Sequence, residues 1–255
     1  MNRRRFIHNS IAATFAASLP ASTLWAVSLR HMPTEVTADI NAVTGAGDQL
    51  TLKQAAVQEL SDSLKGKLLL PGSEGYDAAR LLLNPDFNKY PALVVQPTGA
   101  ADIGNSVTFA RENGLLLAVK CGGHSASGNS SCNGGMQIDL SHMRGVRVDP
   151  AARTARVEGG SLLGELDHES MAYGLVTTAG TVSHTGVGGL TLGGGFGRLG
   201  RRFGLTLDNA LEYDVVTADG TLRHASADEN SDLFWGLRGG GGNYGIVTSF
   251  LFRLH

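Results

Sequence analysis

Glycine is concentrated in two stretches of this sequence, and that concentration limits what the chain can fold into. The first stretch is Lys120-Cys121-Gly122-Gly123-His124-Ser125. The second runs from Gly180 to Gly197 as GTVSHTGVGGLTLGGGFG, with eight glycines in eighteen residues. Because glycine has no Cβ atom, backbone N–H groups in such stretches can approach a bulky anionic ligand closely. The pattern predicts a cofactor-binding region built largely from main chain.

Composition narrows the class of protein. With 255 residues, 42% of them hydrophobic, the chain is long enough for one large or two small domains with a core. The formal net charge of −2 and the lack of a basic stripe predict that nucleic acid is not a partner. Cys121 and Cys132 either pair in an oxidising compartment or remain free thiols, and both alternatives stay open. No metal site is expected, since a fourth zinc ligand does not accompany these cysteines and His124.

Residues 1–28 have the pattern of an export signal. Arg3-Arg4-Arg5-Phe6-Ile7 is followed by an apolar run from Ile11 to Ala26 and by small residues up to Ser28. Pro20 and polar residues interrupt the run, so it is too short and too mixed for a stable membrane span. The arginine motif resembles a twin-arginine signal and predicts a periplasmic or secreted protein, with an ordinary secretory signal as the alternative.

The segment after this signal is expected to lead into the folded domain. Residues 29–50 show no convincing periodicity and are interpreted as a linker, while Leu52–Leu64 has apolar residues at helical spacing. A short helix is expected over Tyr76–Leu83. The predicted organisation is a signal over 1–28, a linker and helical lead-in over 29–67, and one domain over 68–255.

A strand–helix–strand unit opens this domain. Pro91–Pro97 is an apolar run bounded by prolines and predicts a buried strand, and Leu115–Lys120 predicts a second one. Between them, Thr98 is expected to cap a helix over residues 100–112. The short connections predict that the two strands are parallel. Ligands collect at the carboxyl ends of such strands, where the loop Cys121–Asn133 carries the first glycine stretch.

The remainder of the chain predicts short strands and helices, which gives the fold class α+β. A helix over 230–237 is expected, with Phe234 and Trp235 packing inward. The other expected elements are strands over 136–140, 146–149, 154–158 and 244–254, a helix from 162 to about 172 capped by Ser161, and a hairpin of 211–217 with 221–225.

Two short segments resemble known nucleotide-binding and hydrolase motifs but do not meet all of their requirements. Gly195-Phe196-Gly197-Arg198-Leu199-Gly200 satisfies G-x-G-x-x-G, but it follows another glycine run instead of a strand, so a Rossmann fold is not favoured. Gly123-His124-Ser125-Ala126-Ser127 has serine where the hydrolase motif G-x-S-x-G requires its last glycine. Neither nucleotide binding of the Rossmann type nor serine hydrolysis is therefore expected.

Several motifs, taken together and in order, resemble those of a known family. They are Val119–Ser125, Gly180–Gly197, Leu207-Asp208-Asn209, Asp219-Gly220 and Gly242–Thr248. They resemble the FAD-linked oxidases of the vanillyl-alcohol-oxidase superfamily, most closely the berberine-bridge-enzyme-like branch, over about residues 68–255. The resemblance implies a PCMH-type FAD-binding domain, in which a small βαβ-containing subdomain accompanies a subdomain with a mixed or antiparallel sheet.

The resemblance assigns a specific role to His124. In that family the histidine of the first stretch is joined covalently to the 8α-methyl carbon of FAD. Many relatives add a second bond from a cysteine, and the matching position here is Val182. A single covalent bond, through His124, is therefore implied. Lys120 stands where many relatives have arginine, so a specific bidentate ion pair is not expected there.

Further contacts to FAD are implied in the same way. The residues implied for the pyrophosphate are Lys120, Cys121, Gly122, Gly123 and Ser125; those for the flavin ring and ribitol are Gly180, Thr181, Ser183, His184, Gly186 and Gly189; those for the adenine side are Gly245, Ile246 and Val247.

The function implied by the resemblance is that of an FAD-dependent oxidoreductase. A hydride passes from an alcohol, sugar or amine to FAD, and dioxygen reoxidises the flavin to give hydrogen peroxide. Full-length relatives continue into a substrate domain that carries the catalytic base, and this sequence is expected to lack that domain. No catalytic residue is predicted for this reason, and a flavin-binding module without turnover is the alternative. The substrate and the oligomeric state stay open.

Overall fold

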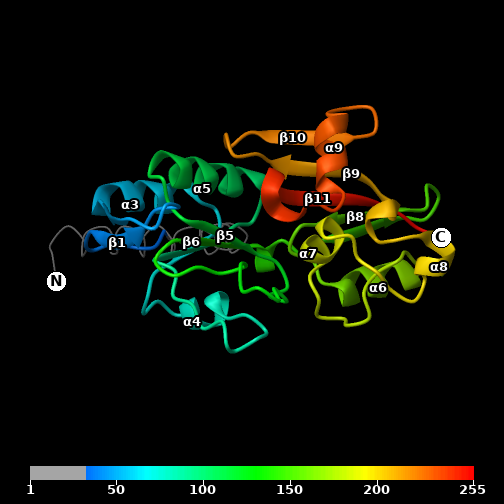
Figure 1. Ribbon diagram of the computed structural model, residues 1–255, viewed down its shortest axis with the longest axis horizontal. Coiled ribbons are helices and arrows are strands. Elements are labelled where there is room, and N and C mark those ends of the chain that lie inside the picture. Colours follow the sequence, from blue (N-terminus) through cyan, green and yellow to red (C-terminus); the bar gives the residue numbers. More distant parts are fainter. Residues whose placement is uncertain (1–32) are drawn as a thin grey trace, which may run out of the picture. The chain divides into compact units, whose positions relative to one another are not determined.

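Two β-sheets organise residues 33–255, the part of the chain that the computed structural model describes (Figure 1). A four-stranded sheet in the order β3-β4-β6-β5 forms the centre of a first lobe, and a five-stranded sheet in the order β10-β9-β11-β8-β7 forms the centre of a second lobe. Each lobe has its own cluster of buried apolar side chains. The mixture of helices with parallel and antiparallel strands confirms the α+β class.

The first lobe has the predicted strand–helix–strand arrangement. β4 (Leu93–Gln96) and β5 (Leu117–Lys120) both pair in parallel with β6 (Met136–Asp139), which lies between them. α5 (Ala100–Glu112) connects β4 to β5, and β3 (Lys67–Leu69) adds an antiparallel edge strand beside β4. Nearly every residue of β4 and β6 is buried, as expected for strands covered on both faces.

Asp102 holds the start of α5, and the expectation that Thr98 caps this helix is wrong. The helix begins after Gly99, without a side-chain cap. The buried Asp102 carboxylate accepts hydrogen bonds from the backbone N–H groups of Lys65, Gly66 and Thr98, each at 2.9 Å. One acid in the first turn thereby ties the helix start to the segment that precedes β3.

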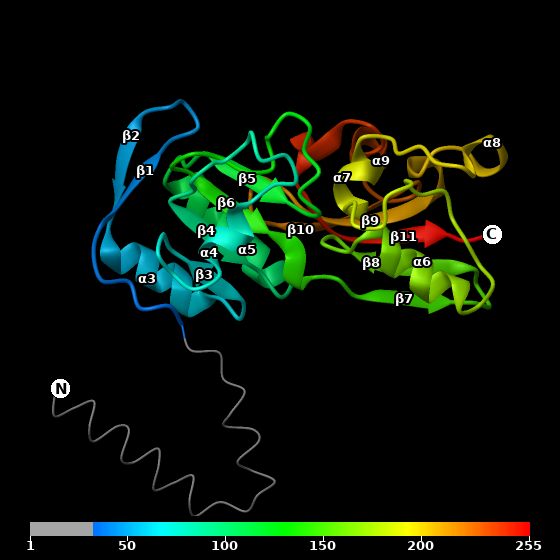
Figure 2. The ribbon, with the colours of Figure 1, turned by 90° about the horizontal axis from the view of Figure 1, so that it is seen from below.

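The lead-in belongs to the first lobe, and the linker interpretation of residues 29–50 is wrong for the described part of that range. β1 (Ile40–Val43) pairs antiparallel with β2 (Gln49–Leu52), and α3 (Gln54–Ser63) follows as the apolar spacing predicted. Ala42 and Leu52 are buried in the same apolar cluster as β4 and β6. Each strand has only four residues, too few for an alternating pattern to stand out. The hairpin lies at the end of the first lobe that faces away from the second sheet (Figure 2).

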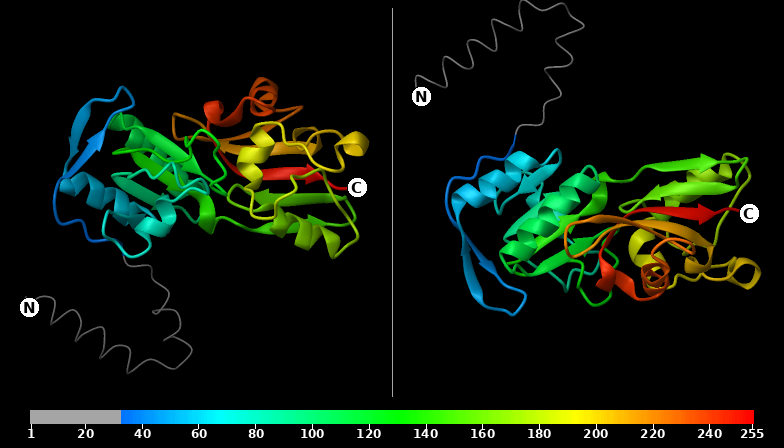
Figure 3. Two further views of the ribbon diagram at one scale, coloured as in Figure 1. Left: turned by 60° about the horizontal axis from the view of Figure 1, so that its bottom comes forward. Right: turned by 90° about the horizontal axis from the view of Figure 1, so that it is seen from above.

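The second lobe is an antiparallel sheet with helices on one side (Figure 3). α6 (Leu163–Met171) contacts β7 and β8, and α9 (Ser231–Leu237) contacts β10. Phe234 packs against the core as expected, but Trp235 is 77% exposed, so its predicted inward packing is wrong. The strands are β7 (Val146–Asp149), β8 (Thr154–Glu158), β9 (Ala210–Val216), β10 (Leu222–Ser226) and β11 (Ile246–Arg253), with β9 and β10 forming the predicted hairpin.

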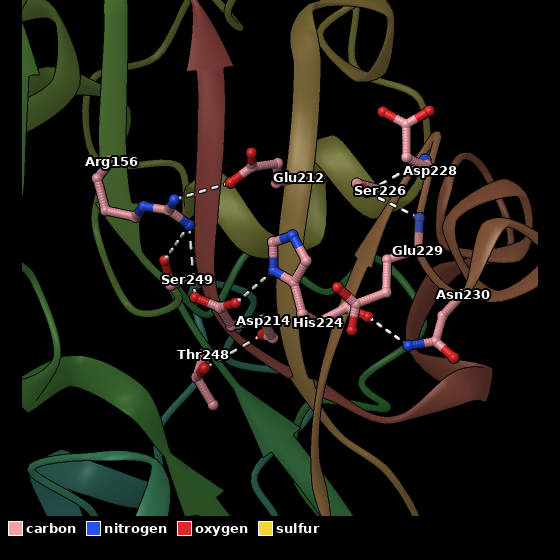
Figure 4. Close-up of polar contacts among 10 residues, drawn as sticks. All are labelled: Arg156, Glu212, Asp214, His224, Ser226, Asp228, Glu229, Asn230, Thr248 and Ser249. Atoms are coloured by element: carbon pink, nitrogen blue, oxygen red, sulfur yellow. Dashed lines mark hydrogen bonds and ion pairs between the residues drawn. The ribbon is translucent and has the colours of Figure 1, made fainter.

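The other face of this sheet is polar (Figure 4). Arg156 on β8 forms ion pairs with Glu212 at 2.8 Å and with Asp214 at 3.4 Å, both on β9. His224 on β10 contacts the same Asp214 at 3.0 Å. Because strand side chains alternate between faces, these polar residues alternate with the core residues of the same strands. The second lobe therefore has its apolar core on one side of the sheet only.

Short helices interrupt the glycine-rich segments, and the sequence did not predict them. α7 (Val187–Leu192) lies inside the second glycine stretch, and α8 (Gly200–Phe203) follows it. α4 is shorter than expected, at Tyr76–Arg80. The 3₁₀ helices are η1 (Leu140–His142), η2 (Leu207–Asn209) and η3 (Gly241–Tyr244).

Two general findings concern the described residues. Cys121 and Cys132 are both free thiols, which decides between the two alternatives for this pair. Within residues 33–255, none of the helices combines the length and the apolar character that crossing a bilayer requires. The predicted export signal at residues 1–28 lies outside the described residues.

Candidate cofactor site

A pocket of about 720 Å³ lies where the carboxyl end of β5 meets the second lobe. Its volume is within the range of about 300–1,000 Å³ that is usual for ligand sites. Most of the residues that line it come from three segments that are far apart in sequence: Leu117–Ser130 from the first lobe, and Thr185–Gly193 and Gly241–Val247 from the second. Leu140 and Gly159 complete the lining. The pocket thus forms at the position predicted from the strand–helix–strand unit, beyond the end of a parallel strand.

The two glycine-rich stretches meet in direct backbone contact in the pocket wall. A Cβ atom added at Gly122 would lie 2.7 Å from the Cα of Gly186 and closer still to its nitrogen. A Cβ added at Gly188 would lie 3.0 Å from the carbonyl oxygen of Gly159. Glycine is required at Gly122 for this approach and not for a left-handed backbone, because its φ is not positive.

No Lys, Arg, Asp or Glu side chain lines this pocket. The polar groups that line it are backbone amides and neutral side chains: Cys121, His124, Ser125, Ser127, Asn129, Ser130, Thr185 and Asn243. An anionic group bound here would be held by N–H and O–H donors of neutral groups, as in other glycine-rich anion sites.

Lys120 has a structural contact on the other side of β5. Its buried ammonium group donates to the backbone carbonyl of Ala79, at the end of α4, and lies 3.7 Å from Asp139 Oδ1. The amide of Gln137 donates to the same carbonyl at 2.8 Å. The side chain of Lys120 therefore fixes the end of β5, and only its backbone remains for the predicted phosphate contact.

Cys121 fills the space between the two glycine stretches. Its sulfur is 3.7 Å from the carbonyl oxygen of Ser161, and a Cβ added at Gly186 would collide with it. Burial raises the pKa of the Cys121 thiol, although backbone N–H groups including that of Gly188 act in the opposite direction. The thiol is therefore held neutral and serves packing more than reactivity.

His124 lies in the pocket lining and contacts a second histidine. Its Nε2 atom is 2.7 Å from Nδ1 of His184, and the two ring centroids are 4.7 Å apart. Desolvation, and then the nearby His184, lowers the pKa of His124 below its ordinary value. The half-buried His124 ring is therefore neutral at physiological pH and retains a nitrogen lone pair, which a nucleophile needs.

The structure brings most of the predicted site residues to the pocket. Gly180, Thr181, Ser183 and His184 lie outside its lining, in a largely exposed turn next to α6, and their predicted contacts stay predictions. The predicted residues that line the pocket are Cys121, Gly122, Gly123, His124, Ser125, Gly186, Gly189, Gly245, Ile246 and Val247.

A third glycine cluster was overlooked as part of the site. Gly241, Gly242 and Asn243 line the pocket, although the sequence analysis named only Gly245, Ile246 and Val247 from this part of the chain as cofactor contacts. Their density of glycine is the same signal that identified the other two stretches. Thr185 and Gly193 also line the pocket, and only the fold could place them there.

A family model described as "FAD binding domain" matches residues 91–226. A curated FAD-linked oxidoreductase of Dictyostelium discoideum is 40% identical over 200 residues, which cover 78% of this chain and 44% of that protein. The chain therefore spans less than half the length of this relative.

Solved structures give the same result. The crystal structure of 6-hydroxy-D-nicotine oxidase from Arthrobacter nicotinovorans matches with a TM-score of 0.74 and 36% identity, over 76% of this chain and 43% of that one. A chitooligosaccharide oxidase matches with a TM-score of 0.74 and 32% identity, over 79% of this chain and 43% of that one.

Proposed function

We propose that this chain, which belongs to the FAD binding domain family, holds FAD in the pocket between its lobes and forms the cofactor-binding part of an FAD-dependent oxidoreductase. The observation that carries the proposal is the meeting of three glycine-rich segments around one pocket with His124 in its lining. The resemblance to FAD-linked oxidases that the motifs indicated is confirmed by the family model and by the relatives.

The residues present fit this cofactor. FAD is long, carries two phosphates and needs close backbone approach, and the pocket offers about 720 Å³ lined by glycine and small hydroxyl side chains. Backbone N–H groups of Gly122 and Gly123, with the hydroxyl of Ser125, would hold the pyrophosphate. Gly245, Ile246 and Val247 would hold the adenine side, and Gly186 and Gly189 the ring side.

The proposed overall reaction is the oxidation of an alcohol, sugar or amine, with dioxygen reduced to hydrogen peroxide. Bound FAD supplies the capacity to accept a hydride equivalent from the substrate. The residues of this chain bind and orient it, and the apolar wall that includes Leu117, Leu140 and Ile246 excludes water from part of the pocket. Two structural relatives bear the name oxidase, one for a hydroxynicotine and one for a chitooligosaccharide, which supports this range of substrates.

We further propose that His124 carries FAD through one covalent bond. It is neutral, half-buried and part of the pocket lining, as a nucleophile toward a bound cofactor must be. At Val182, where many relatives have a second attachment residue, this chain has no nucleophilic side chain. The expected product is therefore FAD bound singly, through the histidine.

The experiment that tests both proposals is purification of the protein followed by acid precipitation. We expect the pellet to stay yellow, with about one flavin per chain, and the His124→Ala variant to bind FAD but to release it on precipitation. A protein that binds no FAD refutes the proposed cofactor. Flavin that remains acid-stable in His124→Ala refutes the attachment residue. Oxygen consumption with a panel of sugars, alcohols and amines then tests turnover.

We also propose export through the twin-arginine pathway, on the motif Arg3-Arg4-Arg5-Phe6-Ile7. That pathway carries folded proteins, which agrees with a cofactor bound before export. The double substitution Arg3→Lys and Arg4→Lys is expected to keep the protein inside the cytoplasm with its signal uncleaved. Cell fractionation and N-terminal sequencing measure this result, and normal export of the double variant would contradict it.

A further inference from the structure

The contact between His124 and His184 joins two separate glycine-rich stretches at the pocket. His124 follows β5 in the first lobe, and His184 lies in the turn that precedes α7 in the second. Their ring nitrogens approach to 2.7 Å, with the ring planes inclined by 38°. This contact uses the Nε2 atom of His124, and the backbone of His184 also hydrogen-bonds the His124 ring.

Backbone hydrogen bonds fix the position of His184. The N–H of Leu163 donates to the carbonyl of Thr185 at 2.9 Å, and the N–H of Gly164 donates to that of Ser183 at 2.8 Å. Both donors belong to the start of α6, which is anchored in the second core. The exposed His184 side chain thus projects from a turn whose main chain is held on both sides of it.

We propose that His184 is the positioning residue for covalent attachment of the cofactor: it orients His124, accepts a hydrogen bond from Nε2 and takes up that proton when the bond to FAD forms. The inference rests on the proposed function, because it concerns the same pocket and the same histidine. The inference goes beyond the proposed function by naming a second residue and the reacting nitrogen. With Nε2 donating to His184, the Nδ1 atom of His124 keeps its lone pair and is the nucleophile.

The chemistry of the attachment balances with dioxygen as the oxidant. An N–H bond of the His124 imidazole and a C–H bond of the 8α-methyl group are broken, and an Nδ1–C bond is formed. Two electrons and two protons are left over, and they reduce dioxygen to hydrogen peroxide. The proton that leaves Nε2 passes to Nδ1 of His184, which is already within hydrogen-bond distance, and from this exposed side chain to solvent.

The test is reconstitution of the purified, FAD-free full-length chain with FAD in air. Two quantities are followed: FAD bound after desalting, and flavin that stays with the protein after acid precipitation at successive times. We expect His184→Ala to bind FAD as the parent chain does, but to form acid-stable flavin about 100-fold more slowly, the typical loss when a proton-transfer group is removed. His168→Ala, a change of an exposed histidine on α6, is the matched control and should behave as the parent.

Added imidazole separates proton transfer from a merely structural role. Because His184 is exposed, free imidazole can enter the space left in His184→Ala, and it should restore much of the lost rate. His184→Gln, which keeps a polar side chain of similar length without a basic ring, should be slow as well and should respond less to imidazole. NMR of the flavin-bearing peptide should show substitution at Nδ1 of His124.

The outcomes are distinguishable. An unchanged rate in His184→Ala, a slow rate that imidazole does not raise, or attachment through Nε2 would overturn the role of His184 and leave the proposed function intact. A parent chain that binds no FAD, or binds it without ever becoming acid-stable, would overturn the proposed function or its covalent bond, and with it this inference. If His184→Ala fails to bind FAD, the rate in His184→Gln decides: a rate equal to that of the parent overturns the role of His184, and a slow rate supports it.

Discussion

Substituting Gly122 by alanine is the sharpest test of how the pocket is built. The added Cβ would lie 2.7 Å from the Cα of Gly186, and both atoms belong to backbone. A flexible side chain could rotate away, but here one of the two glycine-rich stretches must shift as a whole. The substitution leaves the backbone conformation of residue 122 itself acceptable, since its φ is not positive. Any effect therefore comes from the lost approach of the two stretches.

The expected cost follows from overpacking a close contact. Such changes typically destabilise by about 1–3 kcal/mol. For a domain of this size, each kcal/mol lowers Tm by roughly 2–4 °C, so Gly122→Ala should melt roughly 2–12 °C below the parent chain. Because the shift opens the pocket wall, affinity for FAD should fall as well. Circular dichroism melting and fluorescence titration with FAD measure the two effects.

Gly189→Ala is the matched control, because Gly189 also lines the pocket. A Cβ there meets no atom within 4 Å, and the residue lies inside helix α7. Alanine is favoured over glycine in a helix by up to about 1 kcal/mol, so this variant should melt at or above the temperature of the parent. The two variants each add one methyl group to the same pocket, but the expected changes in Tm have opposite signs.

A Gly122→Ala protein that melts with the parent and takes up FAD with unchanged affinity would refute the reasoning. The two stretches would then not be in backbone contact in solution, and glycine at 122 would need another explanation. A Gly189→Ala protein destabilised as strongly as Gly122→Ala would also refute the reasoning, because the effect would then follow from loss of glycine in general.

Two further predictions concern the described fold. Tyr213→Phe should leave the unfolding free energy unchanged or raise it by up to about 1 kcal/mol, because the buried hydroxyl of Tyr213 has no hydrogen-bond partner among residues 33–255. Tyr76→Phe should lower the unfolding free energy by about 0.5–1.5 kcal/mol, because it removes the 2.6 Å hydrogen bond to the Pro91 carbonyl. Urea unfolding of both variants measures this difference, and equal effects would contradict the prediction. The hydrogen bond to Asp214 raises the pKa of His224, so the stabilisation from this pair is present below the unfolded-state pKa of about 6.5 and is lost as pH rises through the folded-state pKa. His224→Gln should therefore lower stability at about pH 6 and have little effect at about pH 8, and a loss that is the same at both values would contradict the assignment.

The parts of the fold that the sequence predicted share a strong local signal. The run between Pro91 and Pro97 could only be a short buried strand, and the helix that follows has unbroken helical spacing up to Gly114. The β9–β10 hairpin was predictable because Asp219-Gly220 closes it, with Gly220 at a φ of 80°. Here the local preferences of the residues and the tertiary structure agree.

Other parts depend on contacts that no local pattern reveals. Trp235 and Phe234 are adjacent and both aromatic, yet the helix turns about 100° per residue and only Phe234 faces the core. α7 forms in spite of two glycines, because its own Val187 and Leu192 side chains are buried in the core of the second lobe. In the same way, the sequence indicated the glycines and His124 of the candidate site. It did not indicate the contact between His124 and His184, because these residues are sixty positions apart.

The pocket also explains why the sequence specifies a cofactor more firmly than a reaction. Its lining holds no carboxylate or ammonium side chain, and the Lys120–Asp139 pair at the end of β5 holds the strand that supports the pocket. Recognition of FAD therefore depends on backbone positions, which glycine makes available and which tolerate few substitutions. The choice of substrate requires side chains of specific shape and charge, and the side chains of this pocket are mostly small and neutral. If His124 is committed to attachment and the Cys121 thiol is held neutral, we expect the groups that act on the substrate to come from outside this pocket.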